Sequence, residues 1–129
     1  MTLRSDAVGT TVLAALSVGP QSVNSNTTVN GSSTNVGRKR VGIVTAVGTR
    51  TDGTYTFKAQ DSVDNSTFVD VPAANVGGSI GAISAANTVA HGYVLPQPGR
   101  PYVRVVCTST SVTVGAVVLG LVGVVGGLV

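Results

Sequence analysis

The residues best suited to chemistry in this chain are few and stand apart from one another. His91 is the only histidine, and no cysteine, glutamate or second histidine lies near it in the sequence. Acid–base catalysis needs a titratable group that its neighbours hold near the substrate, and a zinc site needs three or four ligands. We therefore expect His91 to be a bystander at the start of a strand, with neither a catalytic nor a metal-binding role.

Acidic side chains gather in the segment DSVDNS, where Asp61, Asp64 and Asn65 are of the types that bind calcium. A calcium loop also needs a glycine at its sharp bend and a distal bidentate glutamate, and this segment has neither. Asp and Asn side chains that bond their own backbone in a turn explain the same residues. The segment is predicted to be a turn.

Motifs for nucleophilic catalysis and phosphate binding give no better candidate. No strand–turn–helix context for a Gly-x-Ser-x-Gly elbow is found, and the segment GGSIGA lacks the lysine and the helix of a phosphate-binding loop. The single cysteine, Cys107, rules out an internal disulfide and lies in an apolar run, which indicates a small buried hydrophobe. We expect no enzyme, no cofactor and no metal site.

Charge is sparse, at 10% of residues against about a quarter in typical proteins, and the formal net charge is +3. The only basic cluster is Arg38-Lys39-Arg40, with no aromatic residue among its members. A dense basic surface with interleaved aromatic residues is typical of nucleic-acid binding and is missing here. The triplet is better explained as a solvated strand end or as a patch that pairs with a neighbouring subunit.

The elements that must position these residues are predicted to be strands. Val, Thr, Gly and Ser dominate a chain of 129 residues without any glutamate, and this mixture favours strands and turns over helices. Residues 41–47 are nearly apolar on both faces, as in a central strand. Residues 54–60 alternate strictly, with Tyr55, Phe57 and Ala59 facing inward.

The Asp52-Gly53 pair between these two strands fits a two-residue hairpin turn with positive backbone angles. A short strand in TFVDVP, ended by Pro72, then completes a predicted meander of three strands. Residues 73–90 are small, glycine-rich and nearly uncharged, and we expect a long loop that suits a protein contact. Another strand is expected around 102–107.

The two ends of the chain differ in character. Residues 1–36 are polar and low in charge, and are expected to form an N-terminal arm with the first strand or strands. Residues 37–129 are expected to form the body of the β domain. Residues 112–129 carry no charge, which meets the lower length for a membrane helix of about 18. Their many glycines and valines, and the absence of a following Lys or Arg, favour a buried apolar strand or tail instead.

Several of these segments together resemble a known family. The pieces DGTYTFKAQDSVDNSTFVDVPAANV, GYV and RPYVRVVCTSTSVTVGAVVLG, within residues 38–120, are similar to the small cement or decoration proteins of tailed-phage heads. The resemblance implies a single-domain, all-β antiparallel sandwich or jelly roll with long loops. It also implies a non-enzymatic dimer or trimer that binds the major capsid protein from outside and clamps neighbouring capsid subunits together.

The cement proteins have no active-site residues that could be assigned to this chain. Only positions of contact with other proteins are therefore proposed for it. Arginine offers a planar, two-pronged donor to carboxylates, and an acidic capsid surface would pair with such side chains. The candidate positions for contact with the capsid or with another subunit are Arg38, Lys39, Arg40, Arg100 and Arg104.

Two other classes of function stay open at this point. The first is a secreted or surface β-sandwich module for adhesion or glycan binding, although a chain with three Tyr and no Trp has few of the aromatic platforms that sugars prefer. The second is a membrane-attached virion component that uses the apolar C-terminal run. Nucleic acid is not an expected partner.

Overall fold

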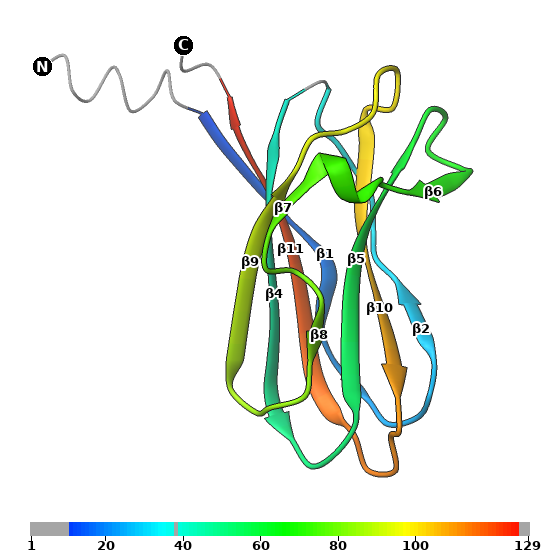
Figure 1. The fold of residues 1–129 in the computed structure, drawn as a ribbon, viewed down its shortest axis with the longest axis vertical. Helices are drawn as coiled ribbons and strands as arrows, with labels where there is room; N and C mark the ends of the chain where they lie inside the picture. The colour runs from blue at the N-terminus through cyan, green and yellow to red at the C-terminus, as the bar shows by residue number, and fades with distance from the viewer. Residues whose placement is uncertain (1–10, 38, 127–129) are drawn as a thin grey trace, which may run out of the picture.

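The computed structural model describes residues 11–37 and 39–126, whose regular secondary structure is almost entirely strand (Figure 1). The only helical element in this part of the chain is the short 3-10 helix η1 (Ala73–Asn75). The strands are β1 (Thr11–Val23), β2 (Thr28–Asn30), β3 (Thr34–Asn35), β4 (Val41–Arg50), β5 (Thr54–Ser62), β6 (Phe68–Asp70), β7 (Val76–Gly78), β8 (Ala82–Ile83), β9 (Thr88–Val94), β10 (Tyr102–Thr110) and β11 (Ala116–Gly126). The predicted all-β class is confirmed.

These strands form two antiparallel sheets packed face to face. The first sheet, sheet A, has the order β1-β11-β4-β9-β7, and the second, sheet B, has the order β2-β10-β5-β6, with β3 added to β10 and β8 added to β5. When the short β3, β7 and β8 are set aside, the remaining strands have the order of a jelly roll, in which two Greek keys are wound together. The predicted sandwich or jelly roll is therefore confirmed.

The core lies between the two sheets and consists mainly of valine. The alternation predicted for β5 is observed, because Tyr55, Phe57 and Ala59 are buried while Thr56 and Lys58 are exposed. Residues 41–47 form the central strand of sheet A, as predicted. Branched side chains fit such a pleated, two-sided core, which explains why so few aromatic residues suffice.

The predicted turn at Asp52-Gly53 is wrong in its geometry and in what it connects. β4 and β5 belong to different sheets, so the link between them crosses from one layer of the sandwich to the other. Only Gly53 has a positive φ, of 96°, whereas a two-residue turn of the expected type needs positive angles at both central residues. The meander therefore reduces to one hairpin, β5–β6, in which Gln60 pairs with Asp70.

The stretch 73–90 is also more ordered than the predicted long loop. It contains η1, β7, β8 and the start of β9, and the short strands attach to the edges of the sheets: Val76 pairs with Val94, and Tyr55 pairs with Ile83. At Gly92 an added Cβ would lie 2.4 Å from the carbonyl oxygen of Gly77. Small residues are needed here because the two backbones meet without room for a side chain.

The two ends of the described chain pair with each other. In the region expected to hold an arm and the first strand or strands, the 13-residue β1 runs antiparallel to β11 from the pair Thr11 and Gly126 to the pair Val23 and Ala116. The apolar C-terminal run is a strand between β1 and β4, as the strand interpretation predicted. Across residues 11–37 and 39–126, no helix has the length and apolar character needed to span a membrane.

Candidate contact surfaces

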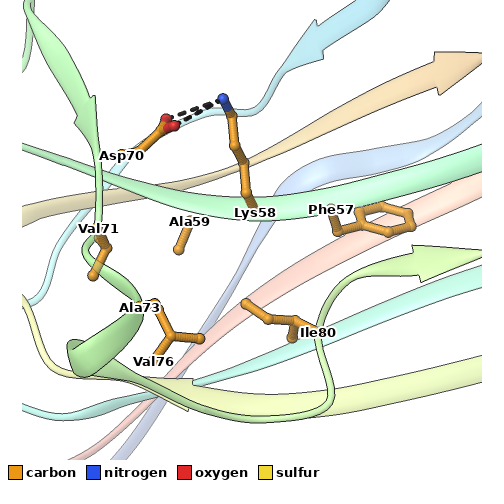
Figure 2. A pocket seen from close by; sticks show the side chains of 8 residues that line it. All are labelled: Phe57, Lys58, Ala59, Asp70, Val71, Ala73, Val76 and Ile80. Carbon is orange, nitrogen blue, oxygen red and sulfur yellow. Dashed lines mark hydrogen bonds and ion pairs between the residues drawn. The ribbon is translucent and has the colours of Figure 1, made fainter.

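A hollow opens at the side of the sandwich, between β5 of sheet B and the segment around η1 and β7 (Figure 2). Its volume is about 320 Å³, and its walls are apolar, with Phe57, Ala59, Val71 and Ile80 among them. Ligand pockets begin at about this size and are lined in this way. The hollow therefore has the size and character to hold an apolar side chain or a small apolar molecule.

An ion pair stands at the rim of this hollow. The Nζ atom of Lys58 lies 3.0 Å from Oδ1 of Asp70, and both side chains are about half exposed. A hydrogen bond from Gln60, followed by the bond from Lys58, lowers the pKa of Asp70. Exposed pairs of this kind contribute little stability, so breaking this pair would cost little.

The second candidate surface is the end of the sandwich where the loops before β4, after β5 and before β10 meet, at the top of Figure 1. We call this the loop end. The backbone N–H of Val36 donates to the carbonyl of Pro101, which ties the β3–β4 link to the start of β10. All the described basic positions singled out from the sequence lie at this end or just below it on sheet B.

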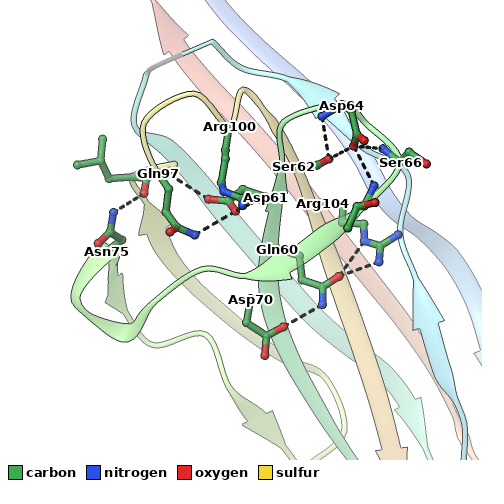
Figure 3. A network of polar contacts seen from close by, with 12 residues as sticks. Gln60, Asp61, Ser62, Asp64, Ser66, Asp70, Asn75, Gln97, Arg100 and Arg104 are labelled. Atoms are coloured by element: carbon green, nitrogen blue, oxygen red, sulfur yellow. Dashed lines mark hydrogen bonds and ion pairs between the residues drawn. The ribbon is translucent and has the colours of Figure 1, made fainter.

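A buried carboxylate holds the β9–β10 loop in place (Figure 3). Asp61 is fully buried at the end of β5 and accepts hydrogen bonds from the backbone N–H and the side-chain amide of Gln97, at 3.0 and 3.2 Å. Arg100 places a guanidinium nitrogen 3.8 Å from the same carboxylate. Buried charges must be paired, so Arg100 is committed to Asp61 and supports the loop.

Arg104 is committed to its neighbours in a similar way. Its guanidinium donates two hydrogen bonds to the Gln60 side chain, at 3.0 and 2.7 Å, and lies 4.0 Å from the centre of the Phe68 ring. Partial burial lowers the pKa of Arg104, although a guanidinium stays protonated at all ordinary pH values. The side chain joins β5, β6 and β10 on the outer face of sheet B.

Lys39 and Arg40 differ from these two arginines because both are exposed and neither lies within 4 Å of a carboxylate in the described part of the chain. The Arg40 guanidinium lies 4.8 Å from the centre of the Tyr93 ring, which is 46% exposed. Sequence reasoning missed Tyr93, because β4 and β9 bring together residues that are far apart in the chain. Arg38 lies outside the described residues.

The remaining chemical candidates occupy separate places. His91 is exposed on β9 and pairs with Val44, and Asp64 accepts hydrogen bonds from the backbone N–H groups of Thr67 and Ser66, which lower its pKa. That geometry confirms a turn at Asp64. The prediction is wrong for Asp61, which lies buried in β5 and bonds the distant Gln97 instead of its own backbone. Cys107 is buried, as predicted, and burial raises the pKa of its thiol to about 11. No group of three or more potential metal ligands occurs among the described residues.

The segment GGSIG fits the letters of a nucleophile elbow around Ser79, but it links two short strands, β7 and β8. The elbow that activates a serine needs a sharp turn from a strand into a helix. Ser79 and its flanking glycines therefore have a structural role at the edge of the sandwich.

Comparison with known proteins adds one structural likeness. The chain is similar to the crystal structure of the SPBc2 prophage-derived protein YomS, with 16% sequence identity, a TM-score of 0.47, and coverage of 88% of this chain and 93% of that one. No protein-family model matches the sequence, and no curated protein matches it either.

Proposed function

We propose that this protein is a non-enzymatic structural component of a virion, which binds the outside of a phage capsid and stabilises it by bridging neighbouring capsid subunits. Two features support the proposal. Residues 38–120 resemble the cement proteins of tailed-phage heads, and the chain folds as a jelly roll, an architecture that recurs in viral capsid domains.

The observation that carries the proposal is the pair of exposed cations at the loop end, Lys39 and Arg40. Because neither is engaged with a carboxylate of the described chain, an acidic group on a capsid subunit would pair with them without breaking an existing ion pair. The planar guanidinium of Arg40 is already oriented by the Tyr93 ring, which reduces the entropy lost when it binds a carboxylate.

Arg100 and Arg104 have a different part in this proposal. Both are held by internal partners, Asp61 and Gln60, so they support the loop end and are not its first point of contact. The capsid-facing cations are Lys39 and Arg40. Each such contact is weak alone, and an oligomer that engages several capsid subunits at once gains affinity through effective concentration.

The test is to mix the purified protein with assembled capsid shells that lack it. We expect addition in a fixed ratio and a higher melting temperature of the shells, because binding to the assembled state stabilises it. Lys39→Glu and Arg40→Glu should each weaken binding by about 10- to 100-fold. Thr56→Glu, which adds a negative charge at an exposed position on the outer face of sheet B, should weaken it by less than about threefold.

The results separate the proposal from its alternative. If the shells bind nothing at micromolar protein, or if the three variants weaken binding equally, the proposed contact is wrong. The half-exposed Tyr93 is the feature that a glycan-binding module would use, since aromatic rings form platforms for sugars. Binding to immobilised glycans that is lost in Tyr93→Ala and kept in Arg40→Glu would favour that alternative.

A further inference from the structure

The outer face of sheet A has no charged side chain across its central strands. Between Gly42 and Gly48 on β4, the outward positions hold small or apolar residues, and the facing positions of β9 and β11 hold no Asp, Glu, Lys or Arg. The exposed large side chains here include Val89, at 66%, and Leu16, at 51%.

Strand register makes this apolar surface continuous. Leu16, Leu121 and Val44 face one another in a row across β1, β11 and β4, and the polar His91 on β9 ends this row. Leu119, Ala46 and Val89 form the adjacent row across β11, β4 and β9. Residues paired in this way point to the same side of a sheet, so the rows make one contiguous patch.

Sheet B provides an internal comparison. Its outward positions carry Lys58, Asp70 and Arg104, together with threonines such as Thr56. An antiparallel sheet whose outer face meets water normally has such polar residues. The outer face of sheet A lacks them, and contiguous exposed apolar patches of this kind mark interaction sites.

We propose that two copies of this chain pack against each other through the outer faces of sheet A. The inference does not depend on the proposed capsid role. Charge supports a second copy as the occupant, because the molecule has a net charge of +3 and this face is where two copies meet without bringing like charges together. An uncharged apolar face is complementary to another face of the same kind.

The size of the face supports the same occupant. Four strands spaced by about 4.8 Å, over about seven residues of about 3.4 Å each, make a face of roughly 20 by 24 Å. Two such faces bury on the order of 1,000 Å² together, which reaches the lower bound of about 1,000 Å² for a biological interface. The expected product is a dimer of moderate affinity.

Two-fold symmetry allows the basic residues of the two copies to lie at opposite ends of the dimer. A closed homodimer uses the same patch on both copies. When the axis passes through the centre of the face and the strands of the two copies run in opposite directions, the Lys39 and Arg40 of one copy lie at the opposite end from those of the other. The dimer thereby presents two separated cationic ends, which suits attachment to two sites at once.

Sedimentation equilibrium of the full chain, from about 1 to about 200 µM, tests the pairing. The wild-type protein should reach the mass of a dimer in this range. Val89→Lys should raise the dissociation constant by at least about 100-fold, because it buries an unpaired charge in the interface. Thr56→Lys, which adds the same charge to the outer face of sheet B, should change it by less than about threefold.

Val44→Thr is a second variant that adds no charge and keeps the shape of the side chain; it should raise the dissociation constant by about 10-fold. Thermal melting of each variant confirms that it is folded. A wild-type monomer at the highest concentration, a trimer, or equal effects of Val89→Lys and Thr56→Lys would each overturn the proposal. A dimer that fails to bind capsid shells would leave it standing and would count against the capsid role alone.

Discussion

Thr45 is a buried polar side chain of sheet A whose hydroxyl has no hydrogen-bond partner among the described residues. The residues beside it on the neighbouring strands are Gly120 and Ala90, and neither has a side chain that can bond. Valine has the same shape, so Thr45→Val should raise the free energy of unfolding by about 1 kcal/mol by removing an unsatisfied group. Urea denaturation measures this difference.

Thr45→Ser is the control for that change, because it keeps the hydroxyl and removes the methyl group. It should lower the free energy of unfolding through lost packing. If Thr45→Val proved less stable than the wild type, the hydroxyl would have to be satisfied in solution, for example by a buried water molecule.

At the scale of an element, the carboxylate of Asp52 holds the link between β10 and β11. It accepts hydrogen bonds from the backbone N–H groups of Thr113, Val114 and Gly115, at 2.9 to 3.1 Å. Burial acts to raise the pKa of Asp52, but these bonds, together with the charge of Arg50, lower it below the usual 3.8. The deprotonated form is therefore favoured by folding.

The sign of the pH dependence follows from this shift. A folded pKa below 3.8 means that the stabilising effect of Asp52 is complete above the unfolded pKa and is lost as the pH falls through the folded one. The difference in unfolding free energy between the wild type and Asp52→Asn should be largest near neutral pH and shrink below pH 3.8. Urea denaturation at several pH values measures it.

Thr113→Ala is the matched control for this pH series, because it leaves both the carboxylate and the backbone N–H donors in place. Its difference from the wild type should not vary with pH. A constant difference for Asp52→Asn over the same range would show that the carboxylate is not coupled to the link.

The same link explains why the strands were easier to predict than their connections. The alternation around Tyr55 and Phe57 is a local signal, and it placed β5 and its buried face correctly. Asp52 next to Gly53 resembles a hairpin turn, but its partners are the N–H groups of residues 113–115. The residues next to Asp52 in the sequence give no sign of its hydrogen bonds to a distant segment. The sequence therefore did not reveal that this link crosses between the sheets.

Short strands were missed for a related reason. β7 and β8 contain two or three residues each, and their glycines and alanines have low strand propensity. These two short strands form because the backbone of β7 pairs with the edge of β9 and the backbone of β8 pairs with the edge of β5. The loop-end surface shows the same limit, since the basic triplet was evident in the sequence, while the contact between Arg40 and Tyr93 depends on the β4–β9 register.

For the whole molecule, pairing of the first strand with the last is the least local feature of the fold. A jelly roll closes only after distant segments meet, so folding in milliseconds to seconds is expected for such a topology. The polar composition of residues 1–36 suggested an arm with the first strand or strands, and β1 contributes the buried Val18 and Val23 to the core. An edge strand exposes polar residues on one face, just as an arm does. Polar composition alone therefore does not distinguish the two.

Val18→Ala tests whether β1 is part of the cooperative unit. Val18 is 1% exposed and lies beside Gly120, whose missing side chain leaves room for it against Val105. Removal of its two methyl groups should lower the free energy of unfolding by about 2 kcal/mol, as large-to-small changes in a core do. Gln21→Ala, at an exposed position of the same strand, should stay within about 0.5 kcal/mol. In urea denaturation, an unchanged m-value for Val18→Ala would show that the whole sandwich unfolds together. If the two variants changed the free energy of unfolding equally, β1 would be detached from the body.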